Sequence, residues 1–175
     1  MARVALKLDD DVSTDVIYPG RYMATGLPGE TAQFAFADDA DFNARLKAKE
    51  IPPGSVIVGG WNFGCGSSRE QAVSCLKGHE LTVVARSFAR IFLQNAVNLG
   101  LRLVTAPEIE ASVGDEIAVG ERLVLNRTTR TAYPAVALPE SRRAIIEAGG
   151  LIPYTRNRLL APATPPSGAL DRMAH

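Results

Sequence analysis

Residues 55–104 alternate between short apolar runs and segments in which apolar residues recur at helical spacing. The apolar runs are residues 55–58, 81–85 and 101–104, and the helical segments between them are residues 70–77 and 87–99. Strands that are separated by helices pair in parallel, and the helices then cover the faces of the sheet. The alternation therefore predicts an α/β fold with a mostly parallel central sheet that is flanked by helices.

Residues before position 55 predict less regular structure, with longer segments between the strand and the helix. We expect a strand at residues 4–8, an extended segment at 16–18 and a helix at 41–50. Residues 23–40 predict a long mobile loop that contains at most a short helical turn. The extended segment follows the acidic turn at Ser13-Thr14-Asp15 and ends at Pro19-Gly20, where a strand or helix is interrupted.

After Pro107 the pattern changes to that of a small C-terminal β-rich portion. Residues 115–127 predict a β-hairpin around Gly120, and a further strand at 131–138 precedes a helix at 140–148. The 175 residues suit one domain, which we expect at residues 1–155, followed by an irregular tail at 156–175.

The composition excludes several classes of partner. Nineteen basic residues balance nineteen acidic ones, so no net charge attracts nucleic acid or an anionic membrane. No apolar stretch approaches the roughly 20 residues that span a bilayer, and no signal peptide precedes the first strand. We therefore expect a cytoplasmic protein. The chain has two cysteines, Cys65 and Cys75, and two histidines, whereas a structural zinc or a cluster needs about four such ligands; we expect no metal on this chain.

A glycine-rich turn follows the apolar run at 55–58. It reads Asn62-Phe63-Gly64-Cys65-Gly66-Ser67-Ser68-Arg69-Glu70, and the helical segment starts at its end. Unpaired N–H groups at a helix start attract anions, and glycine lets a ligand approach the backbone closely. We expect this turn to hold a carboxylate or a phosphate, or to stabilise a serine that has lost its proton.

Ser67 also has a purely structural interpretation. The spacing of Ser67 and Glu70 matches a capping box, in which the two residues satisfy each other's backbone N–H groups. Arg69 argues for a ligand, because a cation in the first helical turn opposes the helix dipole unless an anion lies nearby. A dinucleotide fingerprint is excluded, since Arg69 stands where its third glycine is required.

Two further segments place polar residues near this turn. Ser87 stands at the start of the helix expected at 87–99, and we expect it to act as an N-cap. In the alternative, functional interpretation Arg90 faces the same cleft as Arg69, because both helix starts follow the carboxyl ends of strands. Ser13-Thr14-Asp15 predicts either a capped turn or a carboxylate that supports a serine or an arginine in the site.

Three motifs stand in the order and spacing of the swivel domain of the aconitase family. They run from Asp11 to Tyr22, from Asn62 to Glu70 and from Ala85 to Leu101. Over about residues 3–155 the chain resembles the separately encoded small subunits of 3-isopropylmalate dehydratase and homoaconitase. The resemblance implies that residues 1–155 form a swivel-type β/β/α domain.

The resemblance also implies a reaction and a partner. Enzymes of this family are hydro-lyases that move water across a double bond of a small hydroxy diacid, and isopropylmalate would place the chain in leucine biosynthesis. The [4Fe-4S] cluster would lie on a large subunit, without which this chain would be inactive. Ser67 would be the alkoxide base and Asp15 a second catalytic residue, while Gly66, Ser68 and Arg69 would bind substrate.

The substrate follows from the loop after Tyr22. Aconitase has an arginine there that binds a carboxylate, whereas isopropylmalate enzymes have an apolar residue; this chain has Met23 and Thr25, and no arginine between Arg21 and Arg45. An unpaired carboxylate in a closed site is costly, so Met23 and Thr25 favour an apolar substituent, as in isopropylmalate or another alkylmalate.

Three other interpretations stay open. Gln71 stands where histidine is frequent in the family, a variant found in homoaconitase-like members, so a homoaconitase small subunit is one alternative. A 2,3-dimethylmalate-type dehydratase is another. A stand-alone anion-binding or regulatory module, which would have no large subunit, is an alternative of a different class.

Overall fold

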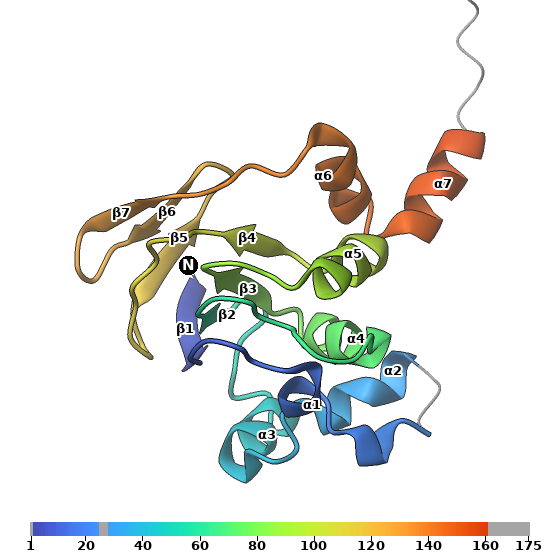
Figure 1. Ribbon diagram of the computed structural model, residues 1–175, viewed down its shortest axis with the longest axis horizontal. Helices are drawn as coiled ribbons and strands as arrows, with labels where there is room; N and C mark the ends of the chain where they lie inside the picture. Colours follow the sequence, from blue (N-terminus) through green and yellow to red (C-terminus); the bar gives the residue numbers. More distant parts are fainter. Residues whose placement is uncertain (1, 25–27, 161–175) are drawn as a thin grey trace, which may run out of the picture.

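The computed structural model describes residues 2–24 and 28–160. Within these residues, seven strands form one sheet in the order β4-β3-β2-β1-β5-β6-β7 (Figure 1). The strands are β1 (Ala2–Lys7), β2 (Val56–Gly59), β3 (Thr82–Ala85), β4 (Leu103–Thr105), β5 (Glu116–Val119), β6 (Leu123–Asn126) and β7 (Thr131–Pro134). Strands β1 to β4 pair in parallel, and β5 to β7 extend the sheet in antiparallel fashion. The expected fold class is confirmed.

The central parallel strands are buried on both faces. Every residue of β2 and β3 is buried, which explains why these strands appear in the sequence as continuous apolar runs and not as an alternating pattern. Alternate residues of β2 face different clusters: Ile57 contributes to the core beneath the helices, and Val56 and Val58 to the core on the opposite face.

The sheet curls until the segment that follows β7 meets β4, the strand at the opposite end of the order. Val136, which follows β7, donates its N–H to the carbonyl of Thr105 in β4 at 2.8 Å. The second core cluster fills the inside of this curl and is made of Val4, Val56, Val58, Val84, Val104, Ala106, Ile109, Ala111, Ile117 and Val124. Two β layers with helices on the outer side of the parallel strands make up the β/β/α arrangement (Figure 1).

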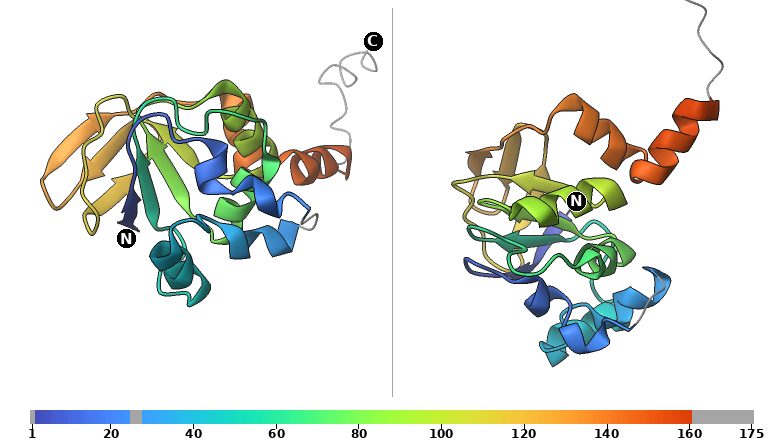
Figure 2. Two further views of the ribbon diagram at one scale, coloured as in Figure 1. Left: turned by 60° about the horizontal axis from the view of Figure 1, so that its bottom comes forward. Right: turned by 45° about the vertical axis from the view of Figure 1, so that its right-hand side comes forward.

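The helices gather beside the parallel half of the sheet, away from the hairpin (Figure 2). They are α1 (Thr14–Ile17), α2 (Pro28–Thr31), α3 (Ala40–Lys47), α4 (Glu70–Gly78), α5 (Arg90–Leu99), α6 (Glu140–Glu147) and α7 (Leu151–Leu160), with 3-10 turns η1 (Gly20–Tyr22) and η2 (Ala32–Phe34). The four helices expected at 41–50, 70–77, 87–99 and 140–148 are confirmed as α3 to α6, with ends that differ by a few residues.

Three expectations about irregular segments were wrong in part. Residues 14–17 form the single-turn helix α1, although an extended segment was expected at 16–18; Ile17 is fully buried and Ser13 caps the turn. Residues 28–34 form α2 and η2 and lead into buried Phe36, where a loop with at most one short helical turn was expected. Residues 156–160, expected in the tail, complete α7; residues 161–175 lie outside the described part of the chain.

Candidate active site

The glycine-rich turn lies at the carboxyl ends of β1, β2 and β3. It leaves β2 and is hydrogen bonded on one side to the segment after β1, where Val12 accepts from the N–H groups of Gly64 at 2.7 Å and Cys65 at 3.1 Å. On its other side, Phe63 donates its N–H to the carbonyl of Ser87 at 3.0 Å. Open α/β sheets bind ligands at this edge, so the fold places the turn where a site is expected.

The two glycines of the turn have different reasons to be glycine. Gly64 has φ +81°, and a Cβ at this position would lie 2.2 Å from the ring of Phe92, so both backbone conformation and packing require it. Gly66 has φ +87°, but a Cβ there would find no atom nearer than 3.8 Å. Its missing side chain therefore leaves open space beside Ser67.

Ser67 and Ser68 are both exposed at the start of α4. The N-cap of α4 is Arg69 and not Ser67, and no side-chain cap hydrogen bond forms there, so the capping-box interpretation of Ser67 and Glu70 was wrong. Among residues 2–24 and 28–160, no protein acceptor bonds the backbone N–H groups of Gly66, Ser67 or Ser68. These donors are available to an anion in front of the helix.

Arg69 is held by Asp15. The guanidinium Nη1 donates to Oδ1 of Asp15 and, at 3.1 Å, to the carbonyl of Tyr18. Asp15 also accepts the N–H of Gly20 at 2.8 Å. The Arg69 guanidinium first, and the Gly20 N–H second, hold the pKa of the Asp15 carboxyl below its ordinary value. Asp15 is therefore ionised at neutral pH, and it orients Arg69 as a fixed anion.

Thr14 contacts the main chain on both sides of Gly66. Its N–H donates to the carbonyl of Cys65 at 2.8 Å, and its hydroxyl donates to the carbonyl of Ser67 at 2.9 Å. Sequence reasoning assigned no contact to Thr14. The available signal was its position beside Asp15 in the motif that precedes the turn.

The expectation for Ser87 was also wrong. Helix α5 begins at Arg90, and its N-cap is Ala89, which makes no side-chain cap hydrogen bond. The Ser87 hydroxyl instead accepts the N–H of Asn62 at 2.8 Å, so it supports the glycine-rich turn. Within the described residues, no hydrogen bond or ion pair joins Arg90 to Arg69 or to the serines.

Met23 is the described residue of the expected substrate loop. Met23 is 44% exposed. Its N–H donates to the carbonyl of Gly20 at 3.1 Å, and the N–H of Gly20 in turn donates to Asp15. Thr25, the other residue expected to contact an apolar substituent, lies outside the described residues.

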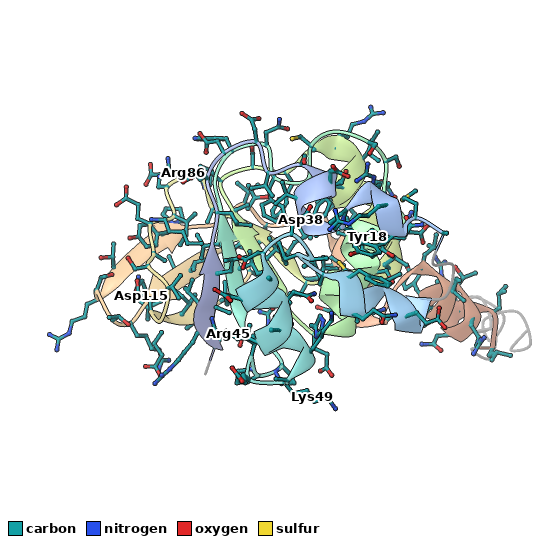
Figure 3. The ribbon with its side chains drawn as sticks, turned by 90° about the horizontal axis from the view of Figure 1, so that it is seen from below. Tyr18, Asp38, Arg45, Lys49, Arg86 and Asp115 are labelled. Atoms are coloured by element: carbon teal, nitrogen blue, oxygen red, sulfur yellow. The ribbon has the colours of Figure 1, made fainter. Side chains whose placement is uncertain are left out.

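The site is an open surface, because Gly66, Ser67 and Ser68 are all exposed. A cavity of about 820 Å³ is lined by Arg86 and Asp115 but by neither Ser67 nor Arg69. Figure 3 shows these two cavity residues on one side of β1 and Tyr18, whose carbonyl bonds Arg69, on the other side. An open arrangement of this kind suits a site that is closed by a second chain.

Two properties of the described residues bear on cofactors and membranes. No group of three or more His, Cys, Asp or Glu side chains among residues 2–24 and 28–160 is arranged to hold a metal ion. Within the same ranges, every helix is too short or too polar to cross a bilayer.

Comparison with known proteins matches this chain to an aconitase domain and to small subunits of related enzymes. The family model of the aconitase C-terminal domain matches residues 29–108. The 3-isopropylmalate dehydratase small subunit of Methanosarcina mazei is 43% identical, over 87% of this chain and 94% of that protein. The isopropylmalate/citramalate isomerase small subunit of Methanocaldococcus jannaschii is 45% identical, over 87% of this chain and 92% of that protein.

A solved structure agrees with these matches. The crystal structure of a 3-isopropylmalate dehydratase from Methanocaldococcus jannaschii has a TM-score of 0.81 and 39% identity, and the match covers 90% of this chain and 94% of that one. Identity above 40% over nearly the whole length of the relatives, together with the shared fold, shows the family. The chain belongs to the 3-isopropylmalate dehydratase small subunits of the aconitase family.

Proposed function

We propose that this chain is the small subunit of a hydro-lyase that interconverts 2-isopropylmalate and 3-isopropylmalate by removing and restoring water. The observation that supports this most is the exposed Ser67 at the start of α4, beside an arginine that an ionised Asp15 holds in place. The identity of 43% with a 3-isopropylmalate dehydratase small subunit supports the choice of reaction.

Ser67 is the base in this proposal. Its alkoxide takes a proton from the carbon next to a substrate carboxylate, and the serine returns that proton when water is added back. Serine is a weak base unless its oxyanion is stabilised by N–H groups and a cation that are already in position. The N–H groups at the start of α4 and the Arg69 guanidinium supply this stabilisation, and Asp15 keeps the guanidinium oriented.

Arg69 and Ser68 bind a carboxylate of the substrate together with the N–H of Gly66. One amino group of the guanidinium is used by Asp15 and Tyr18, so the rest of the fork remains for the substrate. Met23 and Thr25 contact the apolar substituent, in agreement with the lack of an arginine between Arg21 and Arg45.

The proposal requires a partner large subunit. The described residues of this chain do not fit an iron–sulfur cluster, because they contain no group of three or more His, Cys, Asp or Glu side chains that could hold a metal ion. We place the [4Fe-4S] cluster on the large subunit, where it would supply Lewis acidity for the departing hydroxyl. The active site would then form between the two chains, on the open surface around Ser67.

Reconstitution with a large subunit tests this proposal. The two chains are coexpressed and copurified, iron and sulfide are restored anaerobically, and the ultraviolet absorbance of the unsaturated product is followed. We expect turnover of 3-isopropylmalate, no activity from the isolated chain, and no activity from a complex with Ser67→Ala. A complex that assembles with its cluster and turns over none of the hydroxy acids offered would contradict the proposal.

Citramalate is a second candidate substrate, because the relative from Methanocaldococcus jannaschii carries both names and is 45% identical. Its methyl group is a smaller apolar substituent than isopropyl. The same assay with citramalate, homocitrate and 2,3-dimethylmalate ranks the substrates by kcat/KM. A preference for homocitrate, which has an additional carboxylate, would contradict an apolar pocket at Met23.

A further inference from the structure

We propose that Thr14 is a positioning residue that sets the conformation of the Ser67 turn; this inference rests on the proposed role of Ser67 as the base. Thr14 is only 2% exposed. Its backbone N–H and its hydroxyl both point at the turn and donate to the carbonyls of Cys65 and Ser67, at 2.8 Å and 2.9 Å. The two acceptors flank Gly66.

These two hydrogen bonds determine where the free N–H groups of the turn point. In a trans peptide the carbonyl of one residue and the N–H of the next point in opposite directions. Because the carbonyls of Cys65 and Ser67 face Thr14, the N–H groups of Gly66 and Ser68 face away from it. They have no protein acceptor among the described residues, so Thr14 directs two donors outward at the place where Ser67 is exposed.

Gly66 makes this support necessary. It has φ +87°, and the place that a Cβ would take has no atom nearer than 3.8 Å. The residue is therefore neither packed nor restricted by a side chain, so the turn can rotate there. The two bonds from Thr14 restrain the peptides on either side. Without the hydroxyl, the carbonyl of Ser67 would be free to turn toward solvent, and the N–H of Ser68 would turn with it.

The element that carries Thr14 also carries the partner of Arg69. Thr14 and Asp15 are adjacent in α1, whose first turn is capped by the Ser13 hydroxyl at 3.3 Å from the N–H of Val16. Ile17 and Tyr18 are fully buried and fix α1 to the core. One short helix thus orients the N–H groups through Thr14 and the guanidinium through Asp15. Donors that a rigid element holds in place in this way can stabilise a negative charge without rearranging.

The test uses the complex reconstituted with the large subunit. Thr14→Val keeps the shape of the side chain and removes the donor, while Thr14→Ser keeps the donor. We expect Thr14→Val to lower kcat by about 10- to 100-fold with KM changed less than about threefold, because Asp15 still orients Arg69. Thr14→Ser, which keeps the hydroxyl, should have a kcat within about threefold of the wild type.

A matched variant separates positioning from a general loss of packing. Thr31 is also 2% exposed, and its hydroxyl lies 2.9 Å from that of Ser74, in the middle of α4. We expect Thr31→Val to affect the melting temperature and to leave kcat unchanged. If the complex of Thr14→Val does not assemble, Thr14→Ala, which leaves room for a water molecule, is measured in the same way.

Three results would overturn the inference: a wild-type kcat for the variants that lack the hydroxyl, an equal loss in Thr14→Ser and Thr14→Val, or the same loss in Thr31→Val. None of these results would affect the proposed function as long as Ser67→Ala is inactive. Conversely, an active Ser67→Ala complex would reject the role of Ser67 itself, and the inference about Thr14 with it.

Discussion

Asp15 and Arg69 are 54 positions apart in the sequence, and their side chains form an ion pair beside the start of α4. The pair explains why a cation is tolerated at the positive end of a helix dipole, where it would otherwise be unfavourable. The Arg69 side chain is 17% exposed and that of Asp15 61%. The guanidinium is therefore partly withdrawn from water, and its charge is less screened than that of a surface arginine.

Replacing Ser67 with alanine should abolish turnover without affecting the fold. We expect kcat to fall by ~10³-fold or more, because the proton then has no positioned acceptor. The melting temperature should change little, since Ser67 is exposed and its side chain caps no helix. Activity of the reconstituted complex is the measurement, and exposed Ser141→Ala is the control. A near-normal rate would exclude Ser67 as the base.

Replacing Arg69 with lysine should weaken substrate binding. The planar guanidinium can bond Asp15, the Tyr18 carbonyl and a substrate carboxylate simultaneously. An ammonium group is a point charge and cannot make all three contacts in the same geometry. We expect KM to rise by about tenfold or more and kcat to fall. Steady-state kinetics on 3-isopropylmalate measure both values, with exposed Arg130→Lys as the control. Unchanged kinetics would mean that Arg69 does not meet the substrate.

Acid should destabilise the protein in part through Asp115. Its pKa is held below the ordinary 3.8, first by the N–H of Ser112 and then by the Asn126 amide. Because the folded pKa lies below the unfolded one, the stabilisation is complete above the unfolded pKa and is lost as pH falls through the folded value. The free energy of unfolding should thus decrease below about pH 4.

Asp115→Asn tests this dependence. The variant should be less stable than the wild type at pH 7, and the difference should shrink as the pH is lowered toward 3. Urea unfolding at pH 7, 4 and 3 measures it, with exposed Glu108→Gln as the control. If the difference in free energy of unfolding between the two proteins stays constant from pH 7 to pH 3, the charge of Asp115 does not contribute to stability.

Lys77 should stabilise the contact between α4, α5 and α6. Its ammonium group donates to the carbonyl of Leu99, at the end of α5, and at 2.7 Å to that of Gly149, just after α6. A cation at two helix C-termini is favourable, so Lys77→Met should lower the free energy of unfolding by about 1 kcal/mol. Urea unfolding measures this free energy, and exposed Lys47→Met should lower it less. An equal decrease in the two variants would show that the contacts of Lys77 with Leu99 and Gly149 do not stabilise the fold.

Much of the fold could be predicted because its core strands are buried on both faces. Strands such as β2 and β3 produce continuous apolar runs, and α4 and α5 produce helical periodicity between them. Helix α1 could not be predicted, because Val16 and Ile17 are β-branched and favour strands. Its one turn exists because Ser13 caps it and Ile17 is buried, and the burial of Ile17 depends on tertiary structure.

The glycine-rich turn was recognisable from its glycines, serines and arginine, but its supports were not. Thr14 and Ser87 reach the turn only because β1 and β3 are the neighbours of β2 in the sheet. Local spacing gives no information about that order. For the same reason Ser87 was expected to be an N-cap: a serine close before a helix looks the same whether it bonds the helix or a different segment.

The hydrogen bond between Val136 and Thr105 has a consequence for assembly. Sheets whose outermost strands are open invite strands from other molecules to add to them. Here the segment after β7 covers the edge of β4 where this bond forms, so an incoming strand cannot pair with β4 at Thr105. At this position a second protein would therefore meet side chains and not free backbone groups of β4.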